Sequence, residues 1–495
     1  MHIALLPSVV AFLGRDHSNF IDGVAHTSAS TQRIGVVDPG TGETVAQLRD
    51  AQAEDVNLAV DSATAAFKGA WAQVTPYQRG VLLNRLADLI EANGEELAQL
   101  ETLSSGKSIN LSRHIEVGQS AVFLRYFAGW ATKIGGQTMT PSFPSMAGEQ
   151  YSAYTLREPV GVVAAIVPWN FSLMIGVWKL GAALTTGCTV VLKPSEYTPL
   201  SLLRLAELAI EAGIAPGVIN VVNGRGQVGQ QLIEHQAVRK VSFTGSVPTG
   251  IAVGKAAMAA DLTRVTLELG GKNAAALLAD ANVDDAVARF VQSAYVHQGQ
   301  VCAAPERLFV HRSIVEQVTQ KMAAMLSQMV IGSPLDEHAQ FGPLSNKPHF
   351  DKILGFFDRA LQSNQVVCGA RAVDRAGYYV EPTLIIANGK DDPLLHEETF
   401  GPVVCVLAFD DEEEELVTLM NDSPFGLTAS IWTNDLSRAL RLIPRIEAGT
   451  VWVNMHTFVD PSVPFGGMKA SGMGREFGSA FIDDYTELKS VIIRY

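Results

Sequence analysis

One cysteine, Cys302, stands where a thiol could take part in chemistry. It follows the run Val283 to Val296, whose apolar spacing predicts a helix, and it closes the polar stretch Gln298-Gly299-Gln300-Val301. A free cysteine is most often a small buried hydrophobe, so its presence alone indicates little. Here, however, Gly299 frees the backbone before the thiol and Pro305 ends any helix near it. The sequence therefore predicts a sulfur that a substrate can reach.

A carboxylate and an amide are candidate partners for this thiol. Glu268 lies between two leucines and precedes Gly270-Gly271, which leave room for a substrate or cofactor. A carboxylate held among apolar groups tends to have a raised pKa, which suits a general base. Asn170 follows a predicted strand, in Val167-Pro168-Trp169-Asn170-Phe171, and its amide can stabilise an oxyanion.

Two glycine patterns compete for the phosphates of a dinucleotide. Gly224-Arg225-Gly226-Gln227-Val228-Gly229 has the spacing of the Rossmann fingerprint, but no acidic residue stands clearly about 20 positions later. Phe243-Thr244-Gly245-Ser246, which continues to Gly250, also lies between a strand and a helix. Its Ser246 can cap that helix and donate to a phosphate. Spacing alone does not choose between the two patterns.

The segment Lys193-Pro194-Ser195-Glu196 ends another predicted strand, at the edge where parallel sheets place ligand-binding groups. Lys193 supplies hydrogen-bond donors. Glu196 can accept from a ribose 2′,3′-diol and would repel a 2′-phosphate, which favours NAD over NADP. The alternative is an ordinary salt bridge within a turn.

The pattern around these candidates predicts α/β architecture. Apolar positions three and four apart indicate a helical layer from Glu54 to about Thr132, and residues 149–158 are expected to leave the main body as an extended segment. Between residues 159 and 270 short strands alternate with helices such as 201–212, which predicts a parallel sheet covered on both faces. A second series runs from residue 273 to about 453, with the active site expected in the cleft between the two units. The predicted strands are 162–167, 189–193, 218–222, 240–243, 263–267 and 273–278.

Composition excludes several classes of function. The formal net charge of −14 at pH 7 and the absence of dense Lys or Arg runs argue against nucleic-acid binding. The four cysteines lie far apart with no CxxC pair, so neither a metal site nor a disulfide framework is expected. The N-terminal segment makes a poor signal peptide, and no apolar run is long enough for a membrane helix. We therefore expect a cytoplasmic protein without a membrane partner.

Taken together, these segments resemble the aldehyde dehydrogenase superfamily, from Phe20-Ile21-Asp22-Gly23 to Ile492. The motifs that carry the resemblance are Pro168-Trp169-Asn170-Phe171, Lys193-Pro194-Ser195-Glu196, Phe243-Thr244-Gly245-Ser246, Glu268-Leu269-Gly270-Gly271-Lys272, Gly299-Gln300-Val301-Cys302, Glu398-Thr399-Phe400-Gly401-Pro402 and Pro464-Phe465-Gly466-Gly467-Met468-Lys469. The resemblance implies a Rossmann-type NAD domain (residues 1–135 and 159–270), a second α/β catalytic domain (271–470) and a small β oligomerisation element (136–158 and 471–495). It also implies a homotetramer, built as a dimer of dimers.

The resemblance assigns roles to single residues. It implies that Cys302 is the nucleophile, Glu268 the general base and Asn170 the oxyanion donor, with NAD as the cofactor. It moves the Gly224 to Gly229 pattern to the adenine end of the cofactor site. The cofactor-binding residues implied are Ile166, Trp169, Lys193, Glu196, Gly226, Gly245, Ser246, Glu398 and Phe400. The residues implied for the substrate tunnel are Phe171, Met174, Ile175, Trp178, Phe458 and Phe465.

Three positions depart from the usual family pattern: Ser172, His297 and His349. His297 either tunes the thiol or packs at a helix end, and packing is the more common role. The apolar and aromatic tunnel favours an uncharged aromatic aldehyde. At finer grain the chain is similar to bacterial enzymes that oxidise phenylacetaldehyde in styrene or phenylethylamine catabolism, notably in His297-Gln298-Gly299-Gln300-Val301-Cys302-Ala303-Ala304, Trp452-Val453-Asn454-Met455-His456-Thr457 and Gly474-Arg475-Glu476-Phe477-Gly478. The alternatives are a broad-specificity or betaine aldehyde dehydrogenase, a CoA-acylating relative, and a catalytically silent binding protein of this fold.

Overall fold

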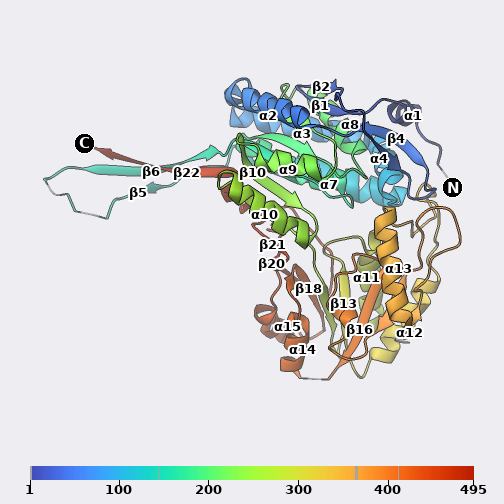
Figure 1. Ribbon diagram of the computed structural model, residues 1–495. Helices are drawn as coiled ribbons and strands as arrows, with labels where there is room; N and C mark the ends of the chain where they lie inside the picture. Colours follow the sequence, from blue (N-terminus) through green and yellow to red (C-terminus); the bar gives the residue numbers. More distant parts are fainter. Residues whose placement is uncertain (1–2, 143, 146, 363–365, 411) are drawn as a thin grey trace.

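The computed structural model describes residues 3–142, 144–145, 147–362, 366–410 and 412–495. Two α/β units lie one above the other, and a long β arm projects from the upper unit (Figure 1). The predicted α/β fold class with two sheet-and-helix units is confirmed. Among the described helices, none combines the length and apolar character that crossing a bilayer would need.

The upper unit is built on an eight-stranded sheet. Its strands, in spatial order, are β2 (Val24–His26), β1 (Asn19–Ile21), β9 (Ile219–Val221), β8 (Thr189–Lys193), β7 (Val162–Ile166), β10 (Val238–Thr244), β11 (Arg264–Glu268) and β21 (Gly472–Met473). The five strands from β9 to β11 run parallel, whereas β1 and β21 join them antiparallel. The carboxyl ends of the five parallel strands therefore meet at one edge, where α/β sheets bind ligands.

Alternate side chains of β7 face two different helical layers, because successive residues of a strand point to opposite faces. Val163 and Ala165 pack in one core with α3, α6, α7 and α8, and Val162 and Ala164 pack in the other with α2, α9 and α10. The bounds of these helices are α2 (Ala53–Lys68), α3 (Pro76–Ala92), α6 (Gly118–Trp130), α7 (Ser172–Thr186), α8 (Leu200–Glu211), α9 (Gly226–Glu234) and α10 (Val247–Asp261). The predicted coverage of both faces is thus confirmed.

The predicted strands are all present, with ends that shift by one or two residues. The largest difference is at β10, which begins at Val238 instead of residue 240 because Val238 pairs with Val162 across a register shift. Such an irregular pairing leaves no mark in the apolar pattern. The predicted helical layer from Glu54 also contains α4 (Gly94–Ser105), the short α5 (Ile109–Leu111) and a π-helical turn, η2 (Ser112–Val117).

The lower unit is a seven-stranded sheet that is parallel except at the edge strand β14. Its strands, in spatial order, are β14 (Val366–Cys368), β15 (Thr383–Ile386), β16 (Val403–Phe409), β13 (Pro305–His311), β12 (Asn273–Leu277), β18 (Thr428–Trp432) and β19 (Thr450–Val453). Helices α11 (Val283–Tyr295) and α12 (Val315–Ser327) cover one face, and α14 (Glu413–Asn421) and α15 (Leu436–Leu442) cover the other. Helix α13 (Lys347–Gln362) packs beside β15 and β16.

The arm is a three-stranded antiparallel sheet. Its strands, in spatial order, are β22 (Thr486–Arg494), β6 (Tyr151–Pro159) and β5 (Thr138–Met139). The pairing of β22 with β6 begins where Thr486 lies opposite Pro159, within the C-terminal part of the predicted oligomerisation element. Residues 143 and 146 of the predicted oligomerisation element lie outside the described residues. The division of the chain into domains by residue number stays a prediction.

Candidate active site

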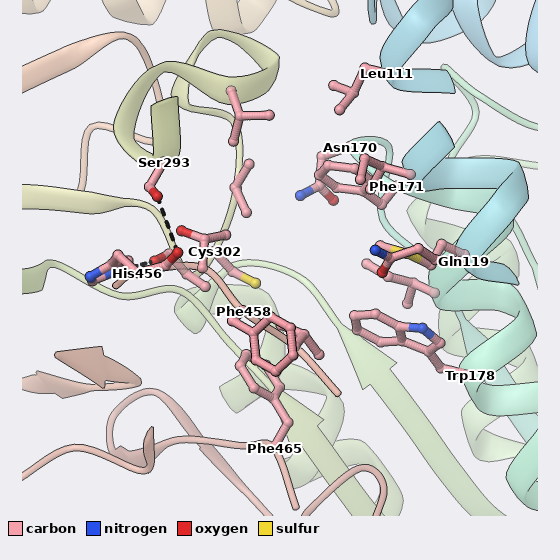
Figure 2. Close-up of a pocket in the computed structure, with 18 of the residues that line it drawn as sticks. Leu111, Gln119, Asn170, Phe171, Trp178, Ser293, Cys302, His456, Phe458 and Phe465 are labelled. Carbon is pink, nitrogen blue, oxygen red and sulfur yellow. Dashed lines mark hydrogen bonds between the residues drawn. The ribbon is translucent and has the colours of Figure 1, made fainter. Parts of the chain in front are cut away.

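Cys302 lies in a loop between α11 and β13, and side chains from distant elements fix its backbone. Asn273, at the start of β12, donates its amide to the carbonyl oxygens of Cys302 (2.7 Å) and Ala304 (2.8 Å). Nε2 of His456 donates to the Ala303 carbonyl at 2.9 Å, and Figure 2 shows this contact beside the sulfur. The Cys302 backbone is therefore held from both sides.

The turn before the thiol requires an unusual backbone. His297, Gln298 and Gly299 all have positive φ, in a short 3₁₀ segment, η3 (Val296–Gly299). A Cβ atom at Gly299 would lie 2.2 Å from the carbonyl oxygen of Gly401, so no larger residue fits there. Pro305, which was expected to end a helix, instead begins strand β13. This tight turn, packed against the loop at Gly401, places the Cys302 thiol where a substrate can reach it, as the sequence predicted.

The surroundings of the Cys302 sulfur favour its neutral thiol form over the thiolate. Burial raises the pKa of Cys302 to about 12, and the carboxylates of Glu268 and Glu398 add to the shift. His297 supplies no compensating cation, because burial first, and then the charge of Lys107, hold its pKa well below the ordinary value. Its ring instead packs edge-on against Phe171, with 5.5 Å between ring centroids. The structure thus favours the packing role for His297.

Glu268 is the last residue of β11, and its side chain is buried beside the thiol. Among the described residues, neither of its carboxylate oxygens has a hydrogen-bond partner. Burial raises the pKa of Glu268 well above the ordinary value, and the nearby Glu476 raises it further. Glu476 itself is paired with Lys179 at 3.1 Å. A carboxyl group without partners that retains its proton can exchange that proton with a thiol or a water molecule.

Asn170 occupies the loop between β7 and α7, with its side chain buried. Its Nδ2 donates to the Gln300 carbonyl at 2.9 Å, and its own carbonyl accepts from Lys107 Nζ at 2.7 Å. An amide nitrogen carries two hydrogens, so one remains for a ligand. Asn170, Glu268 and Cys302 line one cavity of about 410 Å³, so the three predicted catalytic residues are brought together.

The same cavity is lined by all six residues predicted for the substrate tunnel. Figure 2 shows Phe171 and Trp178 to the right of the sulfur, and Phe458 and Phe465 below it. Several further lining residues were not predicted for the tunnel, although Val301, Met455 and Thr457 belong to motifs that carry the resemblance: Leu111, Ile115, Gln119, Val296, Val301, Met455, Thr457 and Val459. Most of them lie on η2 and α6 or in the loop after β19, where the residue pattern indicates only helix or loop. Gln119 adds a polar group to an otherwise largely apolar wall.

Two more cavities extend from the thiol along the upper sheet. The first, of about 210 Å³, is lined by Cys302 and Glu268 as well as by Trp169, Glu398 and Phe400. The second, of about 560 Å³, lies at the carboxyl ends of β7, β8 and β10. Its predicted cofactor residues are Ile166, Trp169, Lys193, Glu196, Gly226, Gly245 and Ser246. Because Trp169, Gly245 and Ser246 line both, the two cavities form one continuous site that contains all nine predicted cofactor residues.

The residues of this site fit a dinucleotide. Ser246 precedes α10, whose first turn contains no acidic residue, and free N–H groups at a helix N-terminus bind phosphates. Lys193 is buried, and the only hydrogen-bond partner of its Nζ among the described residues is the carbonyl of Pro194, at 3.0 Å. Gly226 has open space around it, whereas a Cβ at Gly270 would lie 2.2 Å from the Glu398 carboxylate. Of the first glycine pattern, Gly226 and Gly229 line the cavity, beside Lys193.

His349 shows what one departure from the family pattern does. Its Nε2 donates to the Phe400 carbonyl at 2.7 Å, and its ring lies 5.2 Å from that of Trp169. Burial lowers the pKa of His349 to about 4, so the ring is neutral. The neighbouring Lys352 donates to the Glu398 carbonyl at 3.0 Å. His349 and Lys352 thus support the loop of Glu398 and Phe400.

Comparison with known proteins identifies the family of the chain. The model of the aldehyde dehydrogenase family matches residues 26–491. Phenylacetaldehyde dehydrogenase of Pseudomonas fluorescens is 46% identical over 484 residues, which are 97% of this chain and 96% of that protein. A solved NAD⁺ complex of an aldehyde dehydrogenase from Bacillus cereus has a TM-score of 0.96 at 40% identity, over 100% of this chain and 99% of that chain. An apo betaine aldehyde dehydrogenase from Staphylococcus aureus has a TM-score of 0.94 at 34% identity, over 99% and 98%. With its fold and nearly all of its sequence in agreement, this chain belongs to the aldehyde dehydrogenase family.

Proposed function

We propose that the protein oxidises an aromatic aldehyde, phenylacetaldehyde, to the acid. It is an NAD-dependent aldehyde dehydrogenase, and its cofactor is NAD. The observation that carries the proposal is one cavity in which Cys302, Glu268 and Asn170 meet under an aromatic wall and which adjoins the dinucleotide site. The Pseudomonas fluorescens relative supports the choice of phenylacetaldehyde.

In the proposed mechanism Cys302 is the nucleophile. Its thiol passes the proton to the ionised form of Glu268, and the sulfur adds to the aldehyde carbon. The oxyanion accepts hydrogen bonds from the free N–H of the Asn170 amide and from the Cys302 backbone N–H. The chemistry that bound NAD supplies is acceptance of the hydride from that carbon. The acyl group remains on Cys302 as a thioester. Glu268 releases the thiol proton to solvent and then takes a proton from the water that hydrolyses the thioester, and the sulfur leaves as a thiolate that is protonated again.

The wall of the cavity supports an uncharged aromatic substrate. Phe171, Trp178 and Phe465 are nearly fully buried apolar surfaces that a phenyl ring can contact. Among the residues that the structure describes, Arg289 is the one charged side chain other than Glu268 that lines the cavity, and it is paired with Asp285 at 2.8 Å. A semialdehyde carboxylate would lose solvation without gaining a free cation.

The second candidate is a broad-specificity or betaine aldehyde dehydrogenase on the same scaffold. It is favoured by the similarity to the Staphylococcus aureus enzyme. A CoA-acylating activity fits less well, because that route can do without the hydrolytic base that Glu268 offers. A silent binding protein would have no use for a thiol, a base and an oxyanion donor around one cavity.

A panel of aldehydes separates these candidates. We expect kcat/KM with NAD to be at least about tenfold higher for phenylacetaldehyde than for acetaldehyde, because each buried CH₂ or ring carbon adds binding energy. The measurement is NADH absorbance under steady-state conditions, with betaine aldehyde and a semialdehyde in the same panel. A higher kcat/KM for acetaldehyde or betaine aldehyde would overturn the substrate assignment but leave the enzyme class intact.

The β arm supports the proposed homotetramer. Leu488, Ile492 and Ile493 of β22 are 59%, 69% and 45% exposed, and Leu156 of β6 is 41% exposed. Apolar side chains gathered on a projecting sheet are typical of an interface between subunits. We expect deletion of residues 486–495 to reduce a tetramer to smaller species, measured by light scattering after size-exclusion chromatography. An unchanged tetramer would contradict this role. Residence in the cytoplasm stays a prediction.

A further inference from the structure

Three charged side chains are completely buried beneath the loop of Asn170. Lys107, Glu101 and Glu116 are each 0% exposed. Lys107 Nζ donates to Glu101 at 2.9 Å and to Glu116 at 2.7 Å. We call these three residues the buried triad. It contains two carboxylates and one ammonium group, and none of its members lines the substrate or cofactor cavities.

Each member of the buried triad also holds the chain at the start of α7. Lys107 donates to the Asn170 carbonyl at 2.7 Å. Glu101 accepts from the backbone N–H of Leu173 at 3.2 Å, and Glu116 accepts from that of Met174 at 2.9 Å. The first N–H groups of a helix have no partner within the helix, and negative charge is favourable there. The two carboxylates therefore cap α7, while the ammonium group anchors Asn170, two residues before the helix begins.

The backbone is shaped to bring Glu116 into this position. Glu116 lies in the π-helical turn η2, which contains one residue more per turn than an α-helix. Without that extra residue, Glu116 would be rotated by about 100° around the helix axis. Burial raises the pKa of Glu116 to about 7, so its ionised form is held at a cost in solvation. Local sequence preference does not explain why a π turn and a buried carboxylate occur together. A requirement for the contact between Glu116 and the backbone N–H of Met174 explains both.

We infer that the buried triad is a set of positioning residues that holds Asn170 in place to stabilise the oxyanion. This inference rests on the proposed function. Asn170 is anchored at two points, by Lys107 at its carbonyl and by Gln300 at its side-chain amide. With both anchors in place, the orientation of the Asn170 side chain is fixed, and so is the direction in which its remaining N–H points. Replacing a buried ion cluster by neutral groups of similar shape often leaves stability intact, so the triad is better explained by geometry than by stability.

The test uses two variants of the full-length enzyme. Glu116→Gln keeps the shape of the side chain and an acceptor for Met174, and the triple variant Lys107→Met, Glu101→Gln, Glu116→Gln removes all three charges. We expect kcat for phenylacetaldehyde to fall roughly tenfold to a hundredfold in the triple variant, and less in Glu116→Gln, because small misplacements of a catalytic group have effects of this size. KM for NAD is expected to stay unchanged.

The matched control is Glu96→Gln. Glu96 lies on the same helix, α4, and its carboxylate is paired with Arg204 at 3.2 Å, away from the loop of Asn170. It is expected to keep the wild-type kcat. Melting temperatures are measured for every variant. If the triple variant does not fold, Glu116→Gln decides, and a folded Glu116→Gln with wild-type kcat overturns the inference.

A double-mutant cycle with Asn170→Ala separates the two proposals. Asn170→Ala alone should lower kcat by about 10²- to 10³-fold, the usual loss for an oxyanion donor. If the triad acts through Asn170, adding its substitutions to Asn170→Ala lowers kcat by less than about twofold further. Multiplicative losses would overturn the inference and leave the role of Asn170 intact. Wild-type kcat in Asn170→Ala itself would instead refute the proposed oxyanion donor.

Discussion

Replacement of Cys302 by alanine is expected to lower the rate of NADH formation from phenylacetaldehyde by about four to six orders of magnitude, the loss typical of removing a nucleophile. Without the sulfur no covalent adduct forms, and the hydride has no tetrahedral centre from which to leave. NAD binding should be retained, because the cofactor cavities keep nearly all of their lining residues. The measurements are steady-state NADH absorbance, protein mass after incubation with aldehyde, and fluorescence titration with NAD.

Cys368→Ala is the matched control for this experiment. Cys368 is also partly exposed and also has a raised pKa because of burial, but it lies on the edge strand β14, far along the sheet from the active-site loop. We expect Cys368→Ala to keep the wild-type rate. An acyl adduct that persists in Cys302→Ala, or is lost in Cys368→Ala, would show that the wrong cysteine has been assigned.

Replacement of Glu268 by glutamine is expected to separate the two halves of the reaction. Thioester formation should become slower, because the thiol then loses its proton to solvent, but it should still release about one NADH per active site. Hydrolysis should then stall, with steady turnover lowered about 10²- to 10⁴-fold by loss of the general base. The reason is that Glu268 is the buried carboxylate that lines the thiol cavity and has no hydrogen-bond partner among the described residues. Stopped-flow absorbance measures the burst, and mass spectrometry detects the acyl group on Cys302.

Glu268→Asp provides the control, since it keeps a carboxylate on a side chain one methylene shorter. It should turn over slowly but without a stall. Full steady turnover by Glu268→Gln would falsify the assignment of the base.

The same carboxylate should set the pH dependence. The pKa of Glu268 is raised, so its basic form is scarce at low pH and turnover should rise as pH increases through that pKa. The Cys302 thiol, with a pKa raised to about 12, ionises later and adds no step in the neutral range. In Glu268→Gln the rise that is due to the carboxylate should be missing. A wild-type profile that falls over the same range would mean that an acid, not a base, limits the reaction.

Much of this fold could be predicted because its signals are local. A strand such as β8 is a short apolar run between turn residues, and its predicted bounds agree with the structure. The site residues could be predicted from motifs in the same way. Asn170 and Lys193 each lie at or just after the end of a strand, and parallel strands bring their carboxyl ends to one edge of the sheet. The first residue of β10, Val238, was less predictable, because its inclusion in the strand depends on pairing with β7 across a register shift.

The thiol shows the limit of local signals. Its sequence neighbours offered only His297 as a possible cation, yet the structure buries that ring as a neutral group and raises the pKa of Cys302 instead. Burial and the field of Glu268 and Glu398 come from segments that are distant in the chain. A pKa depends on distances in space, and the order of residues does not supply them.

By itself, the sequence determined the α/β class and the family, and it predicted which residues act as nucleophile, base and oxyanion donor, since each depends on short motifs or on periodicity. Only the tertiary structure decided which other residues complete the site. Gln119 and Met455 reach the substrate cavity, and Lys107 reaches the Asn170 carbonyl across 63 positions of the chain. These residues lie in helices and loops whose local pattern indicates packing alone. Their roles arise from contacts between remote segments, which form only when the chain is folded.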